Sequence, residues 1–350
     1  IIISGDGEVG FYLAKLLEKE FSDITLIDTQ KDKLEFVEKN LGIATVLGDS
    51  TSYKVLKEAN IEKADLLIAV TSNESANIAT SLIGKKLGAK YTIARINNME
   101  YLVDKTTLDL RDLGIDELIS PESLSAREIK RILKYPALTE IIELENGQLF
   151  IMGLKIDNNS PIINRRIEET KQFIPENTFM VVAVHRKGVT IIPNGKTMFE
   201  NGDIVYFVST EKGKKFVMEY SGKKEIEIKN ILMIGGSRTG KFAAYRLSKY
   251  YNVKLIEKNL EKCNQLAKLL PKVHIVNGDG TNIKMLEEEN ISEYDAIISL
   301  TGNSETNIFS CLIGKEAGVS KNIAMVENIG LFDYSQKMGI DSLINKKLAA

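Results

Sequence analysis

Residues 1–10 read IIISGDGEVG, and this stretch decides the fold. An apolar run of strand character leads into the spacing Gly5-x-Gly7-x-x-Gly10, and a segment with helical periodicity follows. The first glycine permits a tight turn, the second lets a phosphate approach the backbone, and the third lets helix and strand pack closely. A helix that begins at such a turn points its N-terminus at the anion. The stretch predicts a nucleotide-binding turn, although a tight turn without ligand would need similar glycines.

The opening pattern recurs at residues 231–240, which read ILMIGGSRTG. Most repeated positions lie 230 residues apart. Asp28 corresponds to Glu257 at an offset of 229, and residues 114–116 correspond to 339–341 at an offset of 225. The pairs at an offset of 230 are Gly5 and Gly235, Gly10 and Gly240, Gly48 and Gly278, Asp49 and Asp279, Asp65 and Asp295, Thr71 and Thr301, Asn77 and Asn307, Gly84 and Gly314, and Lys85 and Lys315. A collinear set of this kind indicates an internal duplication.

Between these motifs, short β-branched runs alternate with amphipathic helices, as in parallel sheets covered by helices. Strands are expected at 1–4, 24–28, 44–47, 66–70 and 91–96, and a helix at 124–133. Asn-Gly turns between 139 and 210 predict a β-rich module, and 212–229 a charged connector. We therefore expect an α/β fold with two Rossmann-type doubly wound parallel-sheet domains separated by a small β-rich α+β module. The expected boundaries are 1–134, 135–221 and 222–350.

Asp28 ends the second expected strand, where a carboxylate accepts hydrogen bonds from ribose hydroxyls. Its negative charge favours NAD or another adenosine nucleotide over NADP, whose 2′-phosphate it would repel. Thr71, Ser72 and Asn73 follow the fourth strand at the edge where such sheets bind ligands. These residues either contact the ligand or cap the next helix, and the two roles are compatible.

The second copy departs from this pattern at three positions. Ser237 replaces the central glycine, so a side chain stands where the phosphate approaches most closely, and Arg238 is a candidate to compensate by binding phosphate. Met325 occupies the position that Arg95, the last residue of the fifth strand, has in the first copy. Either the second site binds more weakly or in another pose, or it has lost its ligand.

Composition excludes several other classes of protein. The formal net charge of -2 provides no basic field for nucleic acid. The two histidines, His185 and His274, stand alone without metal-ligand spacing, and Cys263 and Cys311 are expected to be buried packing residues. No nucleophile or paired acid and base forms a recognisable catalytic pattern, so we expect neither a catalytic nor a metal site. No long apolar run or signal peptide occurs, which favours a cytosolic protein.

The ordered motifs resemble the TrkA family of potassium-uptake regulators, which are built from RCK domains. The resemblance rests on residues 5–10, 25–29, 48–51, 69–72, 94–95 and 255–259, and on 193–195 with 200–205 in the middle module. It covers the whole chain, which ends at residues 348–350, where a second C-terminal module of the family is expected to begin.

The resemblance implies a cytosolic regulatory subunit, peripheral at the inner face of the cell membrane, that controls a membrane potassium-translocating partner. It implies NAD(H) as cofactor, with ATP and ADP as further candidates, and a homo-oligomer, either dimer or tetramer. Neither nucleic acid nor direct membrane insertion is expected.

Motifs and resemblance together give the candidate cofactor-binding residues. In the first copy they are Gly5, Asp6, Gly7, Glu8, Val9, Gly10, Asp28, Thr29, Gly48, Asp49, Ser50, Thr71, Ser72, Asn73 and Arg95. In the second copy they are Gly235, Gly236, Ser237, Arg238, Thr239, Glu257, Gly278, Asp279 and Thr301. A soluble NAD-dependent dehydrogenase is the main alternative, and an assembly protein with vestigial sites is a third.

Overall fold

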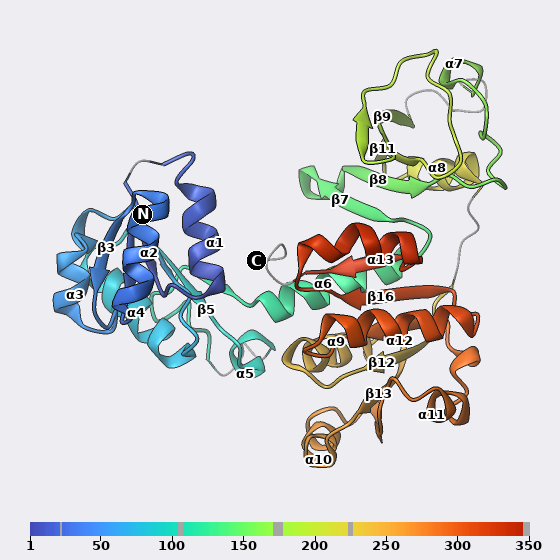
Figure 1. Cartoon of the computed structure of the whole chain (residues 1–350). Coiled ribbons are helices and arrows are strands. Elements are labelled where there is room, and N and C mark those ends of the chain that lie inside the picture. The colour runs from blue at the N-terminus through green and yellow to red at the C-terminus, as the bar shows by residue number, and fades with distance from the viewer. Residues whose placement is uncertain (22, 104–107, 171–177, 223–226, 346–350) are drawn as a thin grey trace. The chain divides into compact units, whose positions relative to one another are not determined.

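The computed structural model describes residues 1–21, 23–103, 108–170, 178–222 and 227–345 (Figure 1). These residues form two compact units, 1–124 and 125–345, and the boundary falls within helix α6 (Pro121–Lys134). The first unit contains one parallel sheet. The second contains an antiparallel sheet and another parallel sheet. The three domain boundaries expected from the sequence remain a prediction.

The first unit is built on a parallel sheet of six strands in the order β3-β2-β1-β4-β5-β6. The strands are β1 (Ile2–Ser4), β2 (Thr25–Asp28), β3 (Ala44–Leu47), β4 (Leu66–Ala69), β5 (Tyr91–Arg95) and β6 (Glu117–Ile119). The order reverses between β1 and β4, and this switch point is where doubly wound sheets bind ligands. The expected Rossmann-type fold is therefore confirmed.

Helices connect these strands and cover both faces of the sheet (Figure 1). They are α1 (Glu8–Leu17), α2 (Lys31–Leu41), α3 (Tyr53–Glu58), α4 (Glu74–Leu87) and α5 (Met99–Val103), with the short turn η1 (Ile61–Lys63) before β4. Ile3, Leu26 and Ile68 pack towards Leu34 and Val37 of α2 in one buried cluster. The other face buries Ile2, Ile27 and Leu67 with residues of α3 and α4. Burial on both faces explains why the strands are almost entirely apolar.

The second parallel sheet has the same order, β14-β13-β12-β15-β16-β17. Its strands are β12 (Asn230–Ile234), β13 (Asn252–Glu257), β14 (Val273–Asn277), β15 (Ala296–Ser299), β16 (Lys321–Met325) and β17 (Ser342–Ile344). Its helices are α9 (Arg238–Leu247), α10 (Leu260–Leu269), α11 (Ile283–Glu288), α12 (Ser304–Glu316) and α13 (Phe332–Met338), with short turns η4 (Ile291–Glu293) and η5 (Ile329–Leu331). The structure therefore repeats the topology as well as the motifs.

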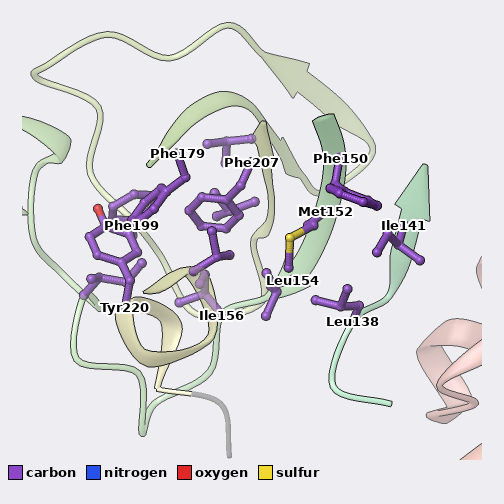
Figure 2. Close-up of a cluster of buried hydrophobic side chains, with 14 residues drawn as sticks. Leu138, Ile141, Phe150, Met152, Leu154, Ile156, Phe179, Phe199, Phe207 and Tyr220 are labelled. Atoms are coloured by element: carbon purple, nitrogen blue, oxygen red, sulfur yellow. The ribbon is translucent and has the colours of Figure 1, made fainter. Parts of the chain in front are cut away.

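The middle module is an antiparallel sheet in the order β10-β9-β11-β8-β7. Its strands are β7 (Glu140–Leu144), β8 (Leu149–Lys155), β9 (Phe179–Arg186), β10 (Val189–Ile191) and β11 (Ile204–Thr210), with helices α7 (Ile167–Thr170) and α8 (Gly213–Ser221) and the turn η2 (Glu145–Gly147). Aromatic side chains fill its core, and Phe179, Phe199 and Phe207 surround Tyr220 of α8 (Figure 2). This module has its own buried apolar cluster.

Two expectations about these elements were wrong or incomplete. The charged segment 212–229 was expected to be a connector, but its first part forms α8, because Val217 and Tyr220 share one face and complete the module's core. The strands β6 and β17, with three residues each, were not expected from the sequence. Cys263 and Cys311 are buried, as predicted.

No helix within the described ranges is long and apolar enough to cross a membrane.

A buried asparagine ties the ligand-facing strand ends of each parallel sheet together. Asn77 of α4 accepts hydrogen bonds from the Thr71 amide (2.9 Å) and hydroxyl (2.6 Å), and donates to the carbonyls of Thr71 and Arg95 (3.0 Å each). Asn307 makes the same bonds with Thr301 and with the Met325 carbonyl. We call each asparagine with these partners an amide clamp. It fixes the loop after the fourth strand to the end of the fifth.

Substitution of Asn77 by Ala removes all four bonds and leaves buried backbone groups without partners. We expect the free energy of unfolding to fall by about 3 kcal/mol. Urea denaturation followed by circular dichroism measures this change. Asn73→Ala is the matched control, because Asn73 caps α4 from an exposed position and its loss costs about 1 kcal/mol. Equal losses of unfolding free energy in the two variants would contradict the stabilising role of the amide clamp.

Candidate nucleotide-binding sites

The three glycines of the turn after β1 have two different roles. Two of them are needed for the backbone geometry, and the third faces open space. Gly5 has φ +101°, and a Cβ there would lie 2.8 Å from the Thr71 Cα. A Cβ at Gly10 would lie 1.8 Å from the Gly5 carbonyl oxygen. At Gly7, however, a Cβ would meet nothing within 4 Å, and φ is an ordinary -80°. Gly5 and Gly10 are therefore required by the fold, whereas Gly7 leaves the space in front of α1 free.

The carboxylate that ends β2 is held in place by two backbone amides. Asp6 donates its N–H to Asp28 Oδ2 at 2.7 Å, and Gln30 donates to Asp28 Oδ1 at 2.9 Å. We call this arrangement the carboxylate fork. It fixes both oxygens while leaving each with lone pairs that can accept further hydrogen bonds.

The second copy contains the same fork with a longer side chain. Gly236 donates its N–H to Glu257 Oε2 at 2.8 Å, and Asn259 donates to Glu257 Oε1 at 2.9 Å. Gly235 repeats the left-handed turn, with φ +95°. The equivalence of Asp28 and Glu257, expected from the sequence, is therefore also geometric.

Thr71, Ser72 and Asn73 form the loop after β4. The Asn73 side chain caps α4 by accepting from the Ala76 N–H at 3.1 Å, and Asn303 caps α12 in the same way. The Thr71 and Thr301 hydroxyls bond within their own loops and to the amide clamps. The capping role foreseen for this loop thus falls to the asparagines, and Ser72 is exposed.

The candidate residues after β3 pack against, or form hydrogen bonds with, neighbouring parts of the protein. A Cβ at Gly48 would lie 2.6 Å from Val55 Cγ2, so this glycine allows α3 to pack. Asp49 accepts from the Thr51 amide and hydroxyl, which lowers its pKa. Ser50 is buried and its hydroxyl bonds to Ser4 (2.6 Å) and Thr80 (3.0 Å).

The remaining candidates of the first copy lie in different settings. Arg95 lies near Glu122, with 3.9 Å between Nη2 and Oε1, and its Nε is buried without a partner among the described residues. Thr29 is exposed, and Val9 packs against the core. The Glu8 side chain lies outside the described part of the structure.

A cavity of about 450 Å³ opens at the fork of the second copy. Six predicted residues line it: Gly235, Ser237, Glu257, Gly278, Asp279 and Thr301. Its volume lies within the range usual for small-molecule sites, about 300 to 1,000 Å³. Sequence reasoning missed two cations in its lining, Lys258 and Lys262. Lys258 follows Glu257 directly, within the stretch 255–259 that carries the family resemblance, and Lys262 lies five residues after Glu257. Nearness to the acid was the signal available for both.

Lys258 and Lys262 add positive charge beside the carboxylates of the second site. Lys258 bonds to Asp279 Oδ2 at 2.8 Å, and with Thr281 it holds the pKa of Asp279 low, at about 2. Lys262 Nζ lies 3.9 Å from Glu257 Oε2. The cavity therefore combines fixed carboxylates with ammonium groups at its wall.

The side chains of the second glycine-rich turn do not all face this cavity. Ser237 caps α9 by accepting from the Gly240 N–H at 3.1 Å, so its hydroxyl stabilises the helix. Arg238 begins α9 and is exposed, and Thr239 is fully buried. Neither Gly236, Arg238 nor Thr239 is among the residues that line the cavity.

Two parallel sheets of Rossmann order, each with a glycine-rich turn and a carboxylate fork, define a protein with tandem dinucleotide-binding folds. The family model for the TrkA-N domain matches residues 1–121 and 231–346, and the TrkA-C domain model matches residues 151–216. The chain belongs to the TrkA family.

Relatives of known name support this assignment along the whole chain. The Trk system potassium uptake protein TrkA of Halomonas elongata is 32% identical over 350 residues, which are 100% of this chain and 77% of the relative. The TrkA homolog of Archaeoglobus fulgidus is 32% identical over 348 residues, 99% of this chain and 78% of the relative.

Solved structures share the fold at lower identity. The GsuK RCK domain aligns with a TM-score of 0.68 and 21% identity, over 99% of this chain and 74% of that one. The GsuK channel bound to NAD aligns with a TM-score of 0.68 and 20% identity, over 99% and 61%. The chain thus has the fold of RCK domains.

The contrast between Gly10 and Gly7 gives a paired test of the turn. Gly10→Ala forces a methyl group into the Gly5 carbonyl, so we expect the free energy of unfolding to fall by about 2 to 3 kcal/mol. Gly7→Ser reproduces Ser237, which has an ordinary φ of -59° and a hydroxyl that caps the helix, so stability should change by only a few tenths of a kcal/mol. Urea denaturation compares the two. A large loss in Gly7→Ser would show that the two turns are not equivalent.

Proposed function

We propose that this chain is the nucleotide-sensing regulatory subunit of a potassium uptake system, and that it binds NAD(H), with ATP and ADP as further candidates. The carboxylate fork is the observation that carries the proposal. It presents a fixed carboxylate beside a helix N-terminus in both copies of a TrkA-family chain. A ribose needs the first feature and a phosphate the second.

The first site would hold the adenosine half of NAD through the fork. Asp28 accepts hydrogen bonds from the ribose hydroxyls, and the amides at the start of α1 meet the pyrophosphate in front of Gly7. The loop of Thr71 to Asn73 forms the rim on the other side of the switch point. The solved GsuK channel with NAD, and another GsuK structure with ADP, show that a similar fold accepts such ligands, which supports this assignment.

The second site would favour ligands with more phosphate charge than the first. Lys258 and Lys262 line its cavity, where their exposed ammonium groups lie beside Asp279 and Glu257 and can turn to an additional phosphate. For a dinucleotide we still expect the first site to bind more tightly, because Gly7 leaves the phosphate path open and Ser237 narrows it. Glu257 would carry the role of Asp28.

Regulation requires a second state and a partner. We propose that the chain assembles as a dimer or tetramer at the cytosolic face of the membrane and acts on a potassium-translocating membrane subunit. A nucleotide shifts the assembly only by its difference in affinity for two arrangements. Coupling energies between such sites are typically about 1 to 3 kcal/mol, which is sufficient to set transport activity.

The central test separates sensing from catalysis. We expect calorimetry to show binding of NAD⁺, NADH or both, and absorbance of the nicotinamide to stay constant in the presence of 2-oxo acids or aldehydes. Steady consumption of NADH would favour the alternative, a dehydrogenase. Failure of every adenine nucleotide to bind would favour an assembly protein with vestigial sites.

Matched substitutions in the two forks rank the sites. Asp28→Ala should reduce NADH affinity by about 1.5 to 3 kcal/mol, because the ribose loses hydrogen bonds to a charged group. Glu257→Ala should reduce it less. Circular dichroism of both variants checks that the folds persist, since each fork also bonds to backbone amides. An equal or larger loss with Glu257→Ala would reverse the ranking.

The proposed assembly can be tested by measuring the molecular mass in solution. Light scattering at tens of micromolar, roughly where ordinary interfaces persist, should give a mass of at least a dimer. The 39.0 kDa monomer mass of this chain sets the reference. A strict monomer at that concentration would remove the interface that the regulatory mechanism needs.

A further inference from the structure

Asp6 places a second carboxyl group against the fork of the first copy only. It occupies the first variable position of the glycine-rich turn and is 7% exposed. Its Oδ1 is buried, and no described group bonds to it. The equivalent position in the second copy is Gly236, where a Cβ would lie 2.4 Å from Leu266 Cδ1 and 3.0 Å from Glu257 Oε2. The second site therefore has no room for this group.

The surroundings of Asp6 disfavour its ionised form. The backbone N–H of Asp6 bonds to Asp28 Oδ2, so two carboxyl groups share one corner of the site. Burial, followed by the charge of Asp28, raises the pKa of Asp6 to about 6, and Lys33 of α2 opposes the shift. Asp28 from β2 and Lys33 from α2 are the charged neighbours within the described structure. A carboxyl of this kind changes charge near neutral pH.

We propose that Asp6 makes nucleotide binding at the first site a proton-uptake reaction, in which its carboxylate takes one proton from solvent as the ligand binds. This inference rests on the proposed function of the fork. The ligand brings a negative pyrophosphate to the turn and excludes water from it, and both effects disfavour a charged Asp6. Asp28 accepts from two backbone N–H groups and would also accept from the ribose hydroxyls, whereas Asp6 Oδ1 has no described partner, so the proton goes to Asp6.

The sign of the effect follows from linkage. In the free protein Asp6 is mostly ionised above pH 6, and in the complex its pKa is higher still. Between these two values binding takes up a proton, so affinity rises as pH falls. Well below pH 6 Asp6 is protonated in both the free protein and the complex, and affinity is constant. If binding raises the pKa of Asp6 by one unit, the affinity at pH 6 exceeds that at pH 8 by about fivefold.

A purely structural role for Asp6 makes a different prediction. A buried carboxyl that only supports the turn would alter stability with pH, but its protonation would not depend on the ligand. Proton uptake on binding is therefore the readout that distinguishes the two roles. The second copy provides an internal control because it has the same fork without this carboxyl.

The experiment uses the full chain and NAD⁺, whose pyrophosphate does not titrate between pH 6 and 8. Glu257→Ala isolates the first site, and Asp28→Ala isolates the second. Calorimetric titrations at pH 7 in phosphate and in Tris, which differ in ionisation enthalpy, give the number of protons taken up. We expect a measurable fraction of a proton at the first site and none at the second.

Asp6→Asn in the Glu257→Ala background retains the shape of the side chain without its charge. We expect this variant to bind NAD⁺ with the same affinity from pH 6 to 8, and more tightly than its parent at pH 8. Binding without proton uptake at the first site, or uptake that persists in Asp6→Asn, would overturn the inference and leave the proposed function standing. Absence of NAD⁺ binding to Glu257→Ala at every pH would overturn both.

Discussion

The hydrogen bonds of the carboxylate fork connect the parts of each site. The acid at the end of the second strand accepts one N–H from the glycine-rich turn and another from the chain that follows the strand. The turn provides its N–H only because Gly5 takes a left-handed conformation against Thr71 and Gly10 lets α1 approach. Backbone, helix and acid thus hold one another in position.

The elements with strong sequence patterns were predicted and those with weak patterns were not. The first five strands of the first sheet were predicted because each is a β-branched run followed by a helix of clear periodicity. The strands β6 and β17 have only three residues, too few for a pattern, and they form because a sheet edge is available beside β5 and β16. The helix α8 was missed because it is short and begins with lysines. Its apolar face is recognised only from the packing of Val217 and Tyr220 in the core.

The candidate sites show a similar division. The glycines and acids of both turns were predicted, because their spacing follows from the geometry of a strand-to-helix turn. Side-chain partners were not predictable. Ser237 was expected to obstruct a phosphate, and its hydroxyl is engaged in capping α9, while Ser50 is occupied by Ser4 and Thr80. Lys258 lies within the motif 255–259 and Lys262 lies just beyond it, but only the fold shows that both line the cavity.

The amide clamps also bear on how the proposed nucleotide signal would leave these sites. A buried asparagine with hydrogen bonds to both neighbouring strand ends makes the ligand-facing edge stiff before any ligand arrives. Little conformational entropy would then be lost there on nucleotide binding, so ordering of this edge would contribute little to regulation. A stiff edge instead transmits force to whatever it contacts. In the proposed sensing role, nucleotide binding would therefore displace intact elements and would not act by ordering this edge.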